Sequence, residues 1–226
     1  MTNLILCEAG LHTREKTMWN QLKEIVLDII FPRICLGCGK EGKYICEKCE
    51  LFLSETPSLF GQGGLEELVS VWEYDGLIKD IILKIKYYGA FEAINELVKK
   101  AFKIRKPYLP EDTIITFVPM FKKKEKRRGF NQAEIIARKV GEMTGSKVLP
   151  LLEKIKDTPS QTKLDKVERL TNIKGSFRRK EGTICGSNVL LVDDVWTSGA
   201  TMRECTRVLK KSGAKRVFGF TLARTV

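Results

Sequence analysis

The chain has 226 residues, 43% of them hydrophobic and 30% charged, which is the composition of a soluble globular protein rather than a membrane-spanning or disordered one. Forty Lys and Arg against 28 Asp and Glu leave a formal charge of +12, which favours polyanionic partners such as nucleic acid or pyrophosphate-bearing ligands, although solvated surface lysines explain the excess equally well. The single histidine, His12, lies in an N-terminal segment to which we assign no fold. This position excludes a Ser-His-Asp or Cys-His catalytic site.

Residues 1–18 have no pattern to which we assign a fold or a function. They lack the basic start and the sustained apolar core of a secretory signal, so we expect a cytoplasmic protein. Met18 stands directly before a better helical pattern, which leaves both Met1 and Met18 as candidate starts of the chain. That pattern predicts a helix over residues 19–31, and Pro32 ends it because proline has no amide proton to donate.

Two Cys-x2-Cys pairs follow the predicted helix. Seven residues separate the pairs, which consist of Cys35, Cys38, Cys46 and Cys49. Four thiolates at this spacing complete the tetrahedral sulfur site that zinc prefers, and they leave no open position for catalysis. A segment this short cannot bury enough apolar area to fold alone, and a reducing cytoplasm favours a metal over disulfides, which are the alternative. We therefore predict a structural zinc module over residues 19–60.

The other three cysteines, Cys7, Cys185 and Cys205, lie apart from this cluster, and we interpret them as ordinary thiols. A segment rich in Gly and Gln at residues 60–64 is typical of a linker or an exposed turn. We place the domain boundary there and predict one larger domain over residues 65–226.

The larger domain alternates between strand-like and helix-like patterns. Period-2 alternation and short apolar runs predict strands at residues 69–74, 113–118, 189–192 and 217–222. Apolar residues at helical spacing predict helices at residues 78–85, 94–101, 133–143 and 201–212. Gly145 ends the third helix, whose apolar face includes Met143. Strands that alternate with helices indicate an α/β fold with a mostly parallel sheet flanked by helices.

The segment after the strand at residues 189–192 contains the candidate ligand-binding residues. Asp193 and Asp194 follow this buried strand, and open α/β sheets bind ligands at the carboxyl edge. Two adjacent carboxylates can accept hydrogen bonds from neighbouring ribose hydroxyls or hold a hydrated divalent cation. Residues 197–201 form a small, hydroxyl-rich loop that opens a helix, whose N–H groups can surround a phosphate. A capping box at residues 201–204 is the alternative, but it explains neither the paired acids nor the glycine.

This segment resembles the phosphoribosyl-pyrophosphate signature of type I phosphoribosyltransferases, with Ser198 where threonine is common and Trp196 where smaller residues are frequent. The resemblance implies a type I phosphoribosyltransferase-like domain that binds phosphoribosyl pyrophosphate together with magnesium. It also implies that Asp193 and Asp194 address the ribose. The residues that it assigns to the 5-phosphate are Thr197, Ser198, Gly199, Ala200 and Thr201.

A strongly basic loop is expected between residues 119 and 132, where six positive charges stand against one negative charge. Such a loop can neutralise pyrophosphate as it leaves or grip a nucleic-acid backbone. A merely solvated run of charge is the third explanation. The run Arg-Gly-Phe-Asn-Gln at residues 128–132 is too particular for a solvated run alone.

The order of these motifs resembles the competence ComF family (ComFC/GntX type) from Trp19 to the C-terminus. Besides the zinc knuckles and the acidic loop, the resemblance lies in residues 86–89, residues 127–132, Gln161, Arg169 and Asn172. It implies a zinc ribbon joined to a phosphoribosyltransferase domain that handles single-stranded DNA in natural transformation. It also implies a DNA-uptake helicase and recombination proteins as further partners. By position, Lys86 and Gly89 resemble a loop that contacts pyrophosphate, and Arg127 and Arg128 resemble part of a mobile loop beside it.

Two functions remain open from the sequence. The first is a DNA-uptake factor that binds phosphoribosyl pyrophosphate and single-stranded DNA. The second is an active phosphoribosyltransferase that displaces pyrophosphate with a nucleobase or another acceptor, and electrostatics and positioning would stabilise its oxocarbenium-like transition state without a histidine base. The motifs identify no catalytic residue and no base-reading pocket, so they leave enzymatic turnover open. A different phosphate ligand, or none, is the remaining alternative.

Overall fold

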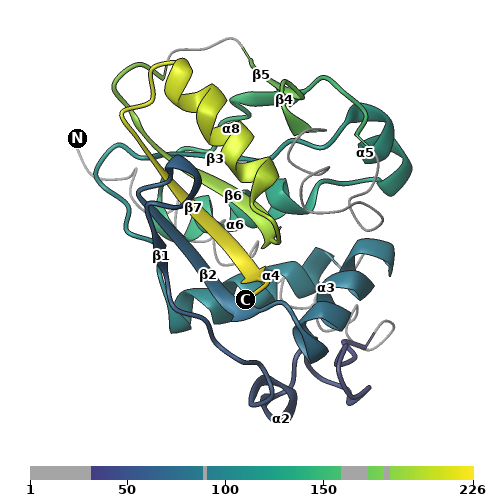
Figure 1. The fold of residues 1–226 in the computed structure, drawn as a ribbon. Coiled ribbons are helices and arrows are strands. Elements are labelled where there is room, and N and C mark those ends of the chain that lie inside the picture. The colour runs from purple at the N-terminus through teal and green to yellow at the C-terminus, as the bar shows by residue number, and fades with distance from the viewer. Residues whose placement is uncertain (1–31, 89–90, 159–172, 181–183) are drawn as a thin grey trace, which may run out of the picture.

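The computed structural model describes residues 32–88, 91–158, 173–180 and 184–226 (Figure 1). The helix expected over residues 19–31 lies outside the described residues, as do Gly89, Gln161, Arg169 and Asn172. Within the described ranges, every helix is too short or too polar to cross a bilayer.

A five-stranded sheet forms the centre of the molecule. Its strands, in spatial order, are β1 (Leu59–Phe60), β2 (Glu67–Glu73), β7 (Arg216–Arg224), β6 (Asn188–Trp196) and β3 (Ile114–Phe117). β2, β7, β6 and β3 run parallel, and β1 is antiparallel to β2 at one edge. The predicted mostly parallel α/β sheet is therefore confirmed.

Helices cover both faces of this sheet (Figure 1). The four longer ones are α3 (Gly76–Tyr88), α4 (Phe91–Ile104), α6 (Gln132–Thr144) and α8 (Ala200–Lys211). Phe220 of β7 contacts Phe102 of α4 with 5.4 Å between ring centroids, whereas a Cβ at the neighbouring Gly219 would lie 3.2 Å from Met202 of α8. Because successive strand residues point to opposite faces, α4 and α8 pack on opposite sides of the sheet.

The core follows from the apolar runs in the central strands. The four residues at 189–192 are fully buried, as expected for a strand covered on both faces. Helix α6 buries Ala133, Ile136, Ala137 and Val140 and ends at Gly145, whose φ of 72° is left-handed. Met143 is 41% exposed, so its predicted place on the apolar face is wrong.

The segment expected to be a basic loop contains a short helix, α5 (Lys122–Arg128). This helix has no buried residues, so the sequence has no apolar periodicity that would predict it. Its composition nevertheless favours a helix, because lysine, arginine and glutamate all have high helix propensity. Gly129 ends it with a φ of 85°, a conformation that residues with a Cβ adopt only under strain. A two-stranded antiparallel sheet of β4 (Leu152–Lys154) and β5 (Phe177–Arg179) was also not predicted.

The glycine-rich segment at residues 60–64 is an exposed turn that contacts α8. A 3-10 turn, η1 (Gln62–Gly64), lies against α8, and a Cβ at Gly63 would stand 2.3 Å from Cγ of Arg203. The residues before it pair with β2 through β1 and through the bond from the Thr56 amide to the Val71 carbonyl at 2.9 Å. The boundary proposed at this point remains a prediction.

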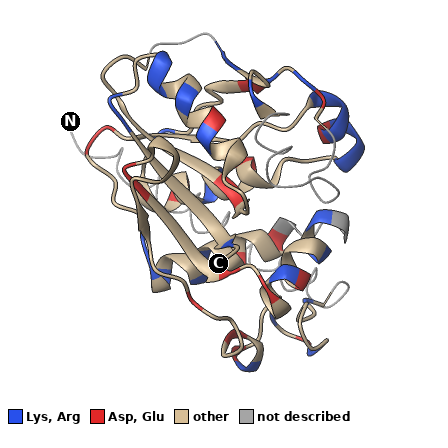
Figure 2. Ribbon diagram, viewed as in Figure 1, with Lys and Arg blue, Asp and Glu red and all other residues tan. Residues whose placement is uncertain are grey.

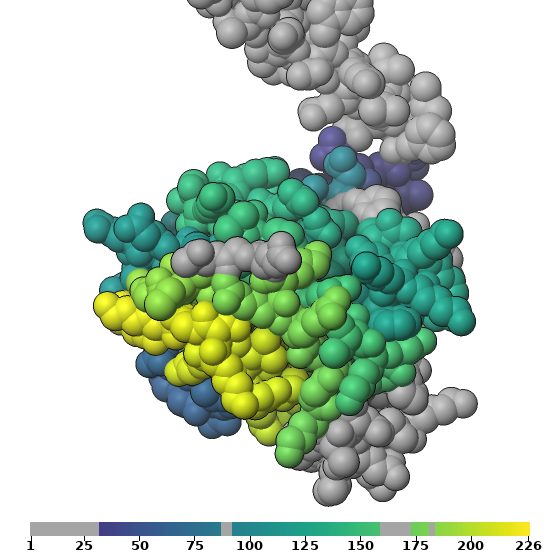
Figure 3. All heavy atoms as spheres, turned by 90° about the horizontal axis from the view of Figure 1, so that it is seen from above, coloured from purple at the N-terminus to yellow at the C-terminus, as the bar shows by residue number. Residues whose placement is uncertain are grey.

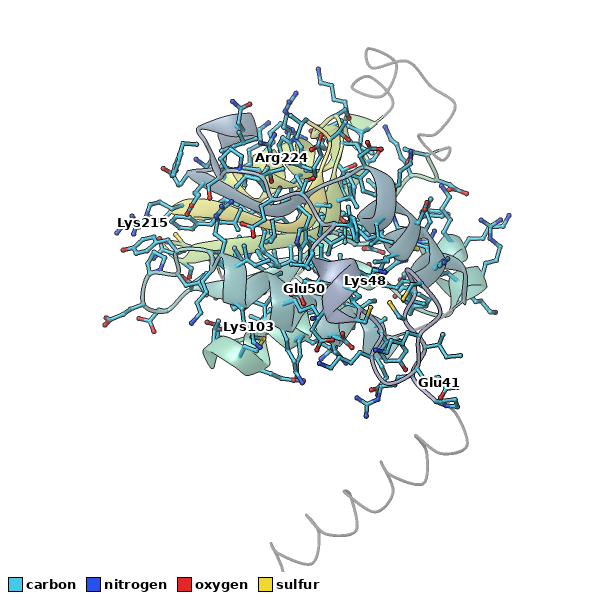
Figure 4. All side chains as sticks on the ribbon, turned by 90° about the horizontal axis from the view of Figure 1, so that it is seen from below. Glu41, Lys48, Glu50, Lys103, Lys215 and Arg224 are labelled. Atoms are coloured by element: carbon cyan, nitrogen blue, oxygen red, sulfur yellow. The ribbon has the colours of Figure 1, made fainter. Side chains whose placement is uncertain are left out.

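The cysteine-bearing segment is attached to helices α3 and α4. The Glu96 carboxylate of α4 accepts the amide protons of Tyr44 and Ile45 at 3.0 and 3.1 Å. The Lys84 amine of α3 donates to the carbonyl of Leu36. Figure 4 shows Lys48 and Glu50 of the short helix α2 (Glu47–Glu50) beside the sulfur atoms of this segment. These contacts hold the cysteine-bearing segment against α3 and α4.

Candidate functional site

A cavity of about 350 Å³ lies at the carboxyl end of β6. It is lined by Tyr74, Lys86 and residues 193–202, so it gathers the predicted ribose and phosphate residues. A larger cavity of about 860 Å³ lies beside the amino ends of β3 and β6, lined chiefly by residues 106–114 and 144–147. We assign the candidate site to the carboxyl end, because open parallel sheets bind their ligands there.

Asp193 and Asp194 lie within β6 and not after it, so the expected strand end at residue 192 is wrong. The neighbouring strand β3 stops at Phe117, which pairs with Val192, while β7 continues to pair with Asp193 and beyond. One edge of β6 is therefore free of strand pairing at the two acids. The amide of Asp194 donates to Oδ1 of Asp193 at 2.9 Å, which holds the pair together.

Lys86 meets the acidic pair from α3. Its Nζ lies 2.7 Å from Oδ2 of Asp194, and the lysine side chain is 20% exposed. Burial opposes the charge of Lys86, but the Asp194 carboxylate outweighs it and raises the lysine pKa. Burial and the adjacent Asp194 charge raise the pKa of Asp193 to about 8. The site therefore combines a lysine with a raised pKa, Lys86, and a carboxyl group with a raised pKa, Asp193.

The predicted phosphate loop leads into the amino end of α8. Gly199 is the N-cap, with a φ of 72°, and the helix begins at Ala200. The alternative of a capping box at residues 201–204 is wrong, because Thr201 already lies inside the helix. The Glu204 carboxylate instead accepts the amide proton of Gly175 at 2.7 Å. Residues 200–202 at the start of α8 line the cavity, and the Ala200 amide donates to Oγ of Ser198 at 3.4 Å. An anion at this position would meet the positive end of the helix dipole.

Trp196 packs directly beneath this loop. It is 6% exposed, and a Cβ added to Gly199 would lie 2.2 Å from Cζ2 of its ring. The Arg203 guanidinium lies 5.7 Å from the ring centroid and helps to hold it. The bulky residue at position 196 therefore supports the predicted phosphate loop, and it requires a glycine at position 199.

We expect Gly199→Ala to lower the free energy of unfolding by about 1–3 kcal/mol more than Gly145→Ala does, because only the first overpacks a buried ring. The two glycines share a φ of +72°, and a Cβ at Gly145 meets nothing within 4 Å, so the backbone strain is matched. Urea denaturation of the two variants measures the difference. Equal losses of stability would contradict the role given to Trp196.

A second cavity of about 420 Å³ adjoins the first and shares Lys86, Asp193, Asp194 and Thr201 with it. The predicted Arg127 and Arg128 line this part of the site. Two further cations, Lys124 of α5 and Lys154 of β4, line it as well. Lys124 belongs to the basic run predicted between residues 119 and 132. Lys154 was not predicted, because β4 lies apart from that run along the chain.

The four predicted metal ligands come together in the segment before β1. The sulfur atoms of Cys35, Cys38, Cys46 and Cys49 all lie within 4.8 Å of one another. A tetrahedral zinc–thiolate site with bonds of about 2.3 Å places its sulfurs about 3.8 Å apart, and the Cys38 and Cys46 sulfurs are separated by 3.7 Å. The arrangement fits zinc. Gly37 is required here, since a Cβ would lie 2.8 Å from the Cys49 sulfur.

Local hydrogen bonds prepare one of these thiols for metal binding. Burial opposes ionisation of Cys35, but amide protons, among them that of Cys46 at 3.4 Å, outweigh it and lower the pKa to about 6. Burial and the neighbouring thiols raise the pKa of Cys49 to about 12. A divalent cation would offset two of the four negative charges and hold all four sulfurs as thiolates.

Comparison with protein families matches residues 126–224 to the phosphoribosyl transferase domain. Competence protein ComFC of Bacillus subtilis is 30% identical over 202 residues, which are 87% of this chain and 80% of the relative. Competence protein F of Haemophilus influenzae is 26% identical over 97% of this chain and 96% of its own. The DNA utilization protein YhgH of Salmonella typhi is 26% identical over 85% of each chain.

Two solved structures also align with parts of the chain. The glutamine phosphoribosylpyrophosphate amidotransferase of Bacillus subtilis covers 58% of this chain and 26% of its own, with 16% identity and a TM-score of 0.37. The purine phosphoribosyltransferase of Pyrococcus horikoshii covers 62% and 85%, with 18% identity and a TM-score of 0.34.

Proposed function

Because this chain belongs to the ComF family of competence proteins and carries a phosphoribosyl transferase domain, we propose that it binds phosphoribosyl pyrophosphate and handles single-stranded DNA in natural transformation. One observation carries the proposal. A single cavity joins the Asp193–Asp194 pair to the amino end of α8, which is the arrangement that a ribose 5-phosphate needs. We expect the protein to act in the cytoplasm.

The two adjoining cavities accommodate the two halves of phosphoribosyl pyrophosphate. In this proposal, the loop at residues 197–201 binds the 5-phosphate, and Asp193 and Asp194 accept hydrogen bonds from the ribose hydroxyls. Arg127 and Arg128 line the second cavity, where they would neutralise pyrophosphate. Magnesium would accompany the pyrophosphate and reduce the repulsion between its charges and the two acids.

The distribution of charge favours the larger domain as the nucleic-acid surface. Residues 32–60 hold four basic and four acidic side chains, so the cysteine module has no excess positive charge. Helix α5 carries six cations against one carboxylate and is almost entirely blue in Figure 2. Figure 3 views the end of the molecule to which α5, α8 and the sheet of β4 and β5 belong. We propose that DNA binds at this end and that zinc braces the fold.

Calorimetry and a gel-shift series test the two halves of the proposal separately. Phosphoribosyl pyrophosphate with magnesium is expected to bind at one site per chain. Single-stranded DNA is expected to shift at low salt and to lose affinity steeply as salt rises, because its phosphates release counterions on binding. No heat with the first ligand, or no shift with the second even at low salt, would refute the corresponding half.

An active phosphoribosyltransferase is the second candidate, favoured by the wall of the second cavity. Val118, Pro119 and Met120 line that cavity beside the two acids, and an apolar surface of this kind suits a planar acceptor. Release of pyrophosphate should then occur with at least one acceptor from a panel of nucleobases. If no nucleobase in the panel causes pyrophosphate release, the domain acts as a binding module and not as a transferase.

A further inference from the structure

A second helix begins at the candidate site, opposite the phosphate loop of α8. Asn131 is the N-cap of α6, and its side-chain oxygen accepts the amide proton of Ala133 at 3.1 Å. Its amide nitrogen donates to the carbonyl of Val118, just beyond β3, also at 3.1 Å. The run at residues 128–132 thus fastens the start of α6 beside the carboxyl end of the sheet, and Gln132 lines the cavity of about 420 Å³.

Gln132 is an incomplete hydrogen-bonding group at this position. Its side chain is 4% exposed, and its Oε1 accepts a hydrogen bond from Nη1 of Arg128 at 2.9 Å. Its Nε2 is buried and has no partner among the described residues. An unpaired buried donor destabilises the free protein, so the group is suited to a ligand that supplies an acceptor oxygen.

The cations of the second cavity are only partly neutralised. Arg127 and Lys154 have no carboxylate oxygen within salt-bridge distance in the described ranges, whereas Lys124 pairs with Asp157 at 3.1 Å. Burial and the neighbouring Lys124 lower the pKa of Lys154, so these amines repel each other in the free protein. An anion beside the start of α6 would accept a hydrogen bond from Nε2 of Gln132 and would reduce the repulsion between Lys124 and Lys154.

The positive charge continues outward from this cavity along α5. Lys122, Lys123 and Lys126 are exposed on its surface, and the seven-residue helix is about 10 Å long. A row of cations that leads from a buried anion site to open solvent suits a chain of repeating phosphates better than a single compact anion.

We propose that a phosphodiester of single-stranded DNA occupies the start of α6, so that DNA and the pyrophosphate half of phosphoribosyl pyrophosphate compete for this position. The phosphate loop of α8 remains free for a 5-phosphate while DNA is bound. This inference rests on the proposed function, since it assigns the two proposed ligands overlapping places in one site. It makes the sugar phosphate a regulator of DNA release.

A displacement experiment tests the competition. A fluorescent single-stranded oligonucleotide is bound to the full chain at constant ionic strength, and its anisotropy is followed during titration. Phosphoribosyl pyrophosphate and pyrophosphate, each with magnesium, should displace the DNA, whereas ribose 5-phosphate should not, because it fits the α8 loop and leaves the start of α6 free. Sodium sulfate at matched ionic strength controls for screening.

Each outcome decides the inference. Displacement by ribose 5-phosphate as effective as that by pyrophosphate would place DNA at the α8 loop and overturn it. No displacement by any of the three would place DNA elsewhere and overturn it too, while the proposed function would stand if both ligands bind separately. Failure of either ligand to bind alone would refute the proposed function, and the inference would fall with it.

Gln132→Glu replaces the amide donor with a carboxylate of the same length. We expect it to weaken binding of DNA and of pyrophosphate by at least about tenfold and to leave binding of ribose 5-phosphate unchanged. Gln62→Glu makes the same change on an exposed turn and should alter none of the three. If the buried variant does not fold, Lys126→Glu on α5 and Lys103→Glu on α4, away from the proposed DNA surface, form an exposed pair. Equal effects of those two on DNA would also overturn the inference.

Discussion

Replacing both Asp193 and Asp194 with asparagine is expected to abolish the thermal stabilisation that phosphoribosyl pyrophosphate and magnesium give the wild-type chain. A ligand at 100 times its dissociation constant adds about 2.7 kcal/mol to the free energy of unfolding. In a chain of this size that is a rise of about 5–10 °C in melting temperature. Asparagine keeps the shape of each side chain but removes the charge and half of the acceptor oxygens that the ribose and the metal would use.

Thermal unfolding with and without ligand measures this effect. Asp80→Asn on the exposed face of α3 makes the same chemical change away from the site and should keep the full shift. A double variant that still gains several degrees from the ligand would show that the ribose does not lie against the acids.

The single variant Asp193→Asn has a further expected effect on the free protein. The folded pKa of about 8 lies above the ordinary value of 3.8, so the folded chain holds the extra proton and wild-type stability falls as pH rises between these values. Asparagine does not titrate. We therefore expect the stability of the variant relative to wild type to rise by more than about 1 kcal/mol between pH 5 and pH 8.5. A constant difference across this range would contradict the assignment.

Removing the zinc site is expected to have the second large effect. Cys46→Ser takes away one of four ligands from a segment whose small core depends on the cluster, and structural zinc contributes directly to folding free energy. We expect loss of the one equivalent of zinc per chain and a drop of at least about 10 °C in melting temperature, or a separate early transition. Metal analysis and thermal unfolding, with and without a chelator, give the two readouts.

Cys185→Ser is the matched control for this change. Cys185 is exposed and lies outside the cluster, so its replacement should leave both zinc content and stability as they are. Full zinc content in Cys46→Ser, or an unchanged melting temperature after the metal is removed, would show that the module does not depend on zinc.

The features that local sequence predicts well are those that depend on short spacings. The cysteine pairs were identified because ligands three residues apart form a knuckle whatever lies around them, and the four sulfurs do gather. The fully buried run at residues 189–192 indicated a central strand, and Gly145 marked a helix end, where its backbone is left-handed. The structure brings Asp193, Asp194 and the loop that follows into one cavity, while their roles remain predictions.

By itself, the sequence determined the α/β class, the mostly parallel sheet, the cysteine cluster and the order of acids, loop and helix, because each depends on residues close together in the chain. Only the tertiary structure decided which cations face the acids, since Lys86, Lys124 and Lys154 arrive from three separate elements. It also decided how far β6 extends, because β7 continues to pair with it after β3 has ended. Trp196 is an unusual residue in the sequence, and in the structure its ring packs under Gly199 and supports the loop at residues 197–201. Contacts of this kind depend on packing between distant segments, which no local pattern records.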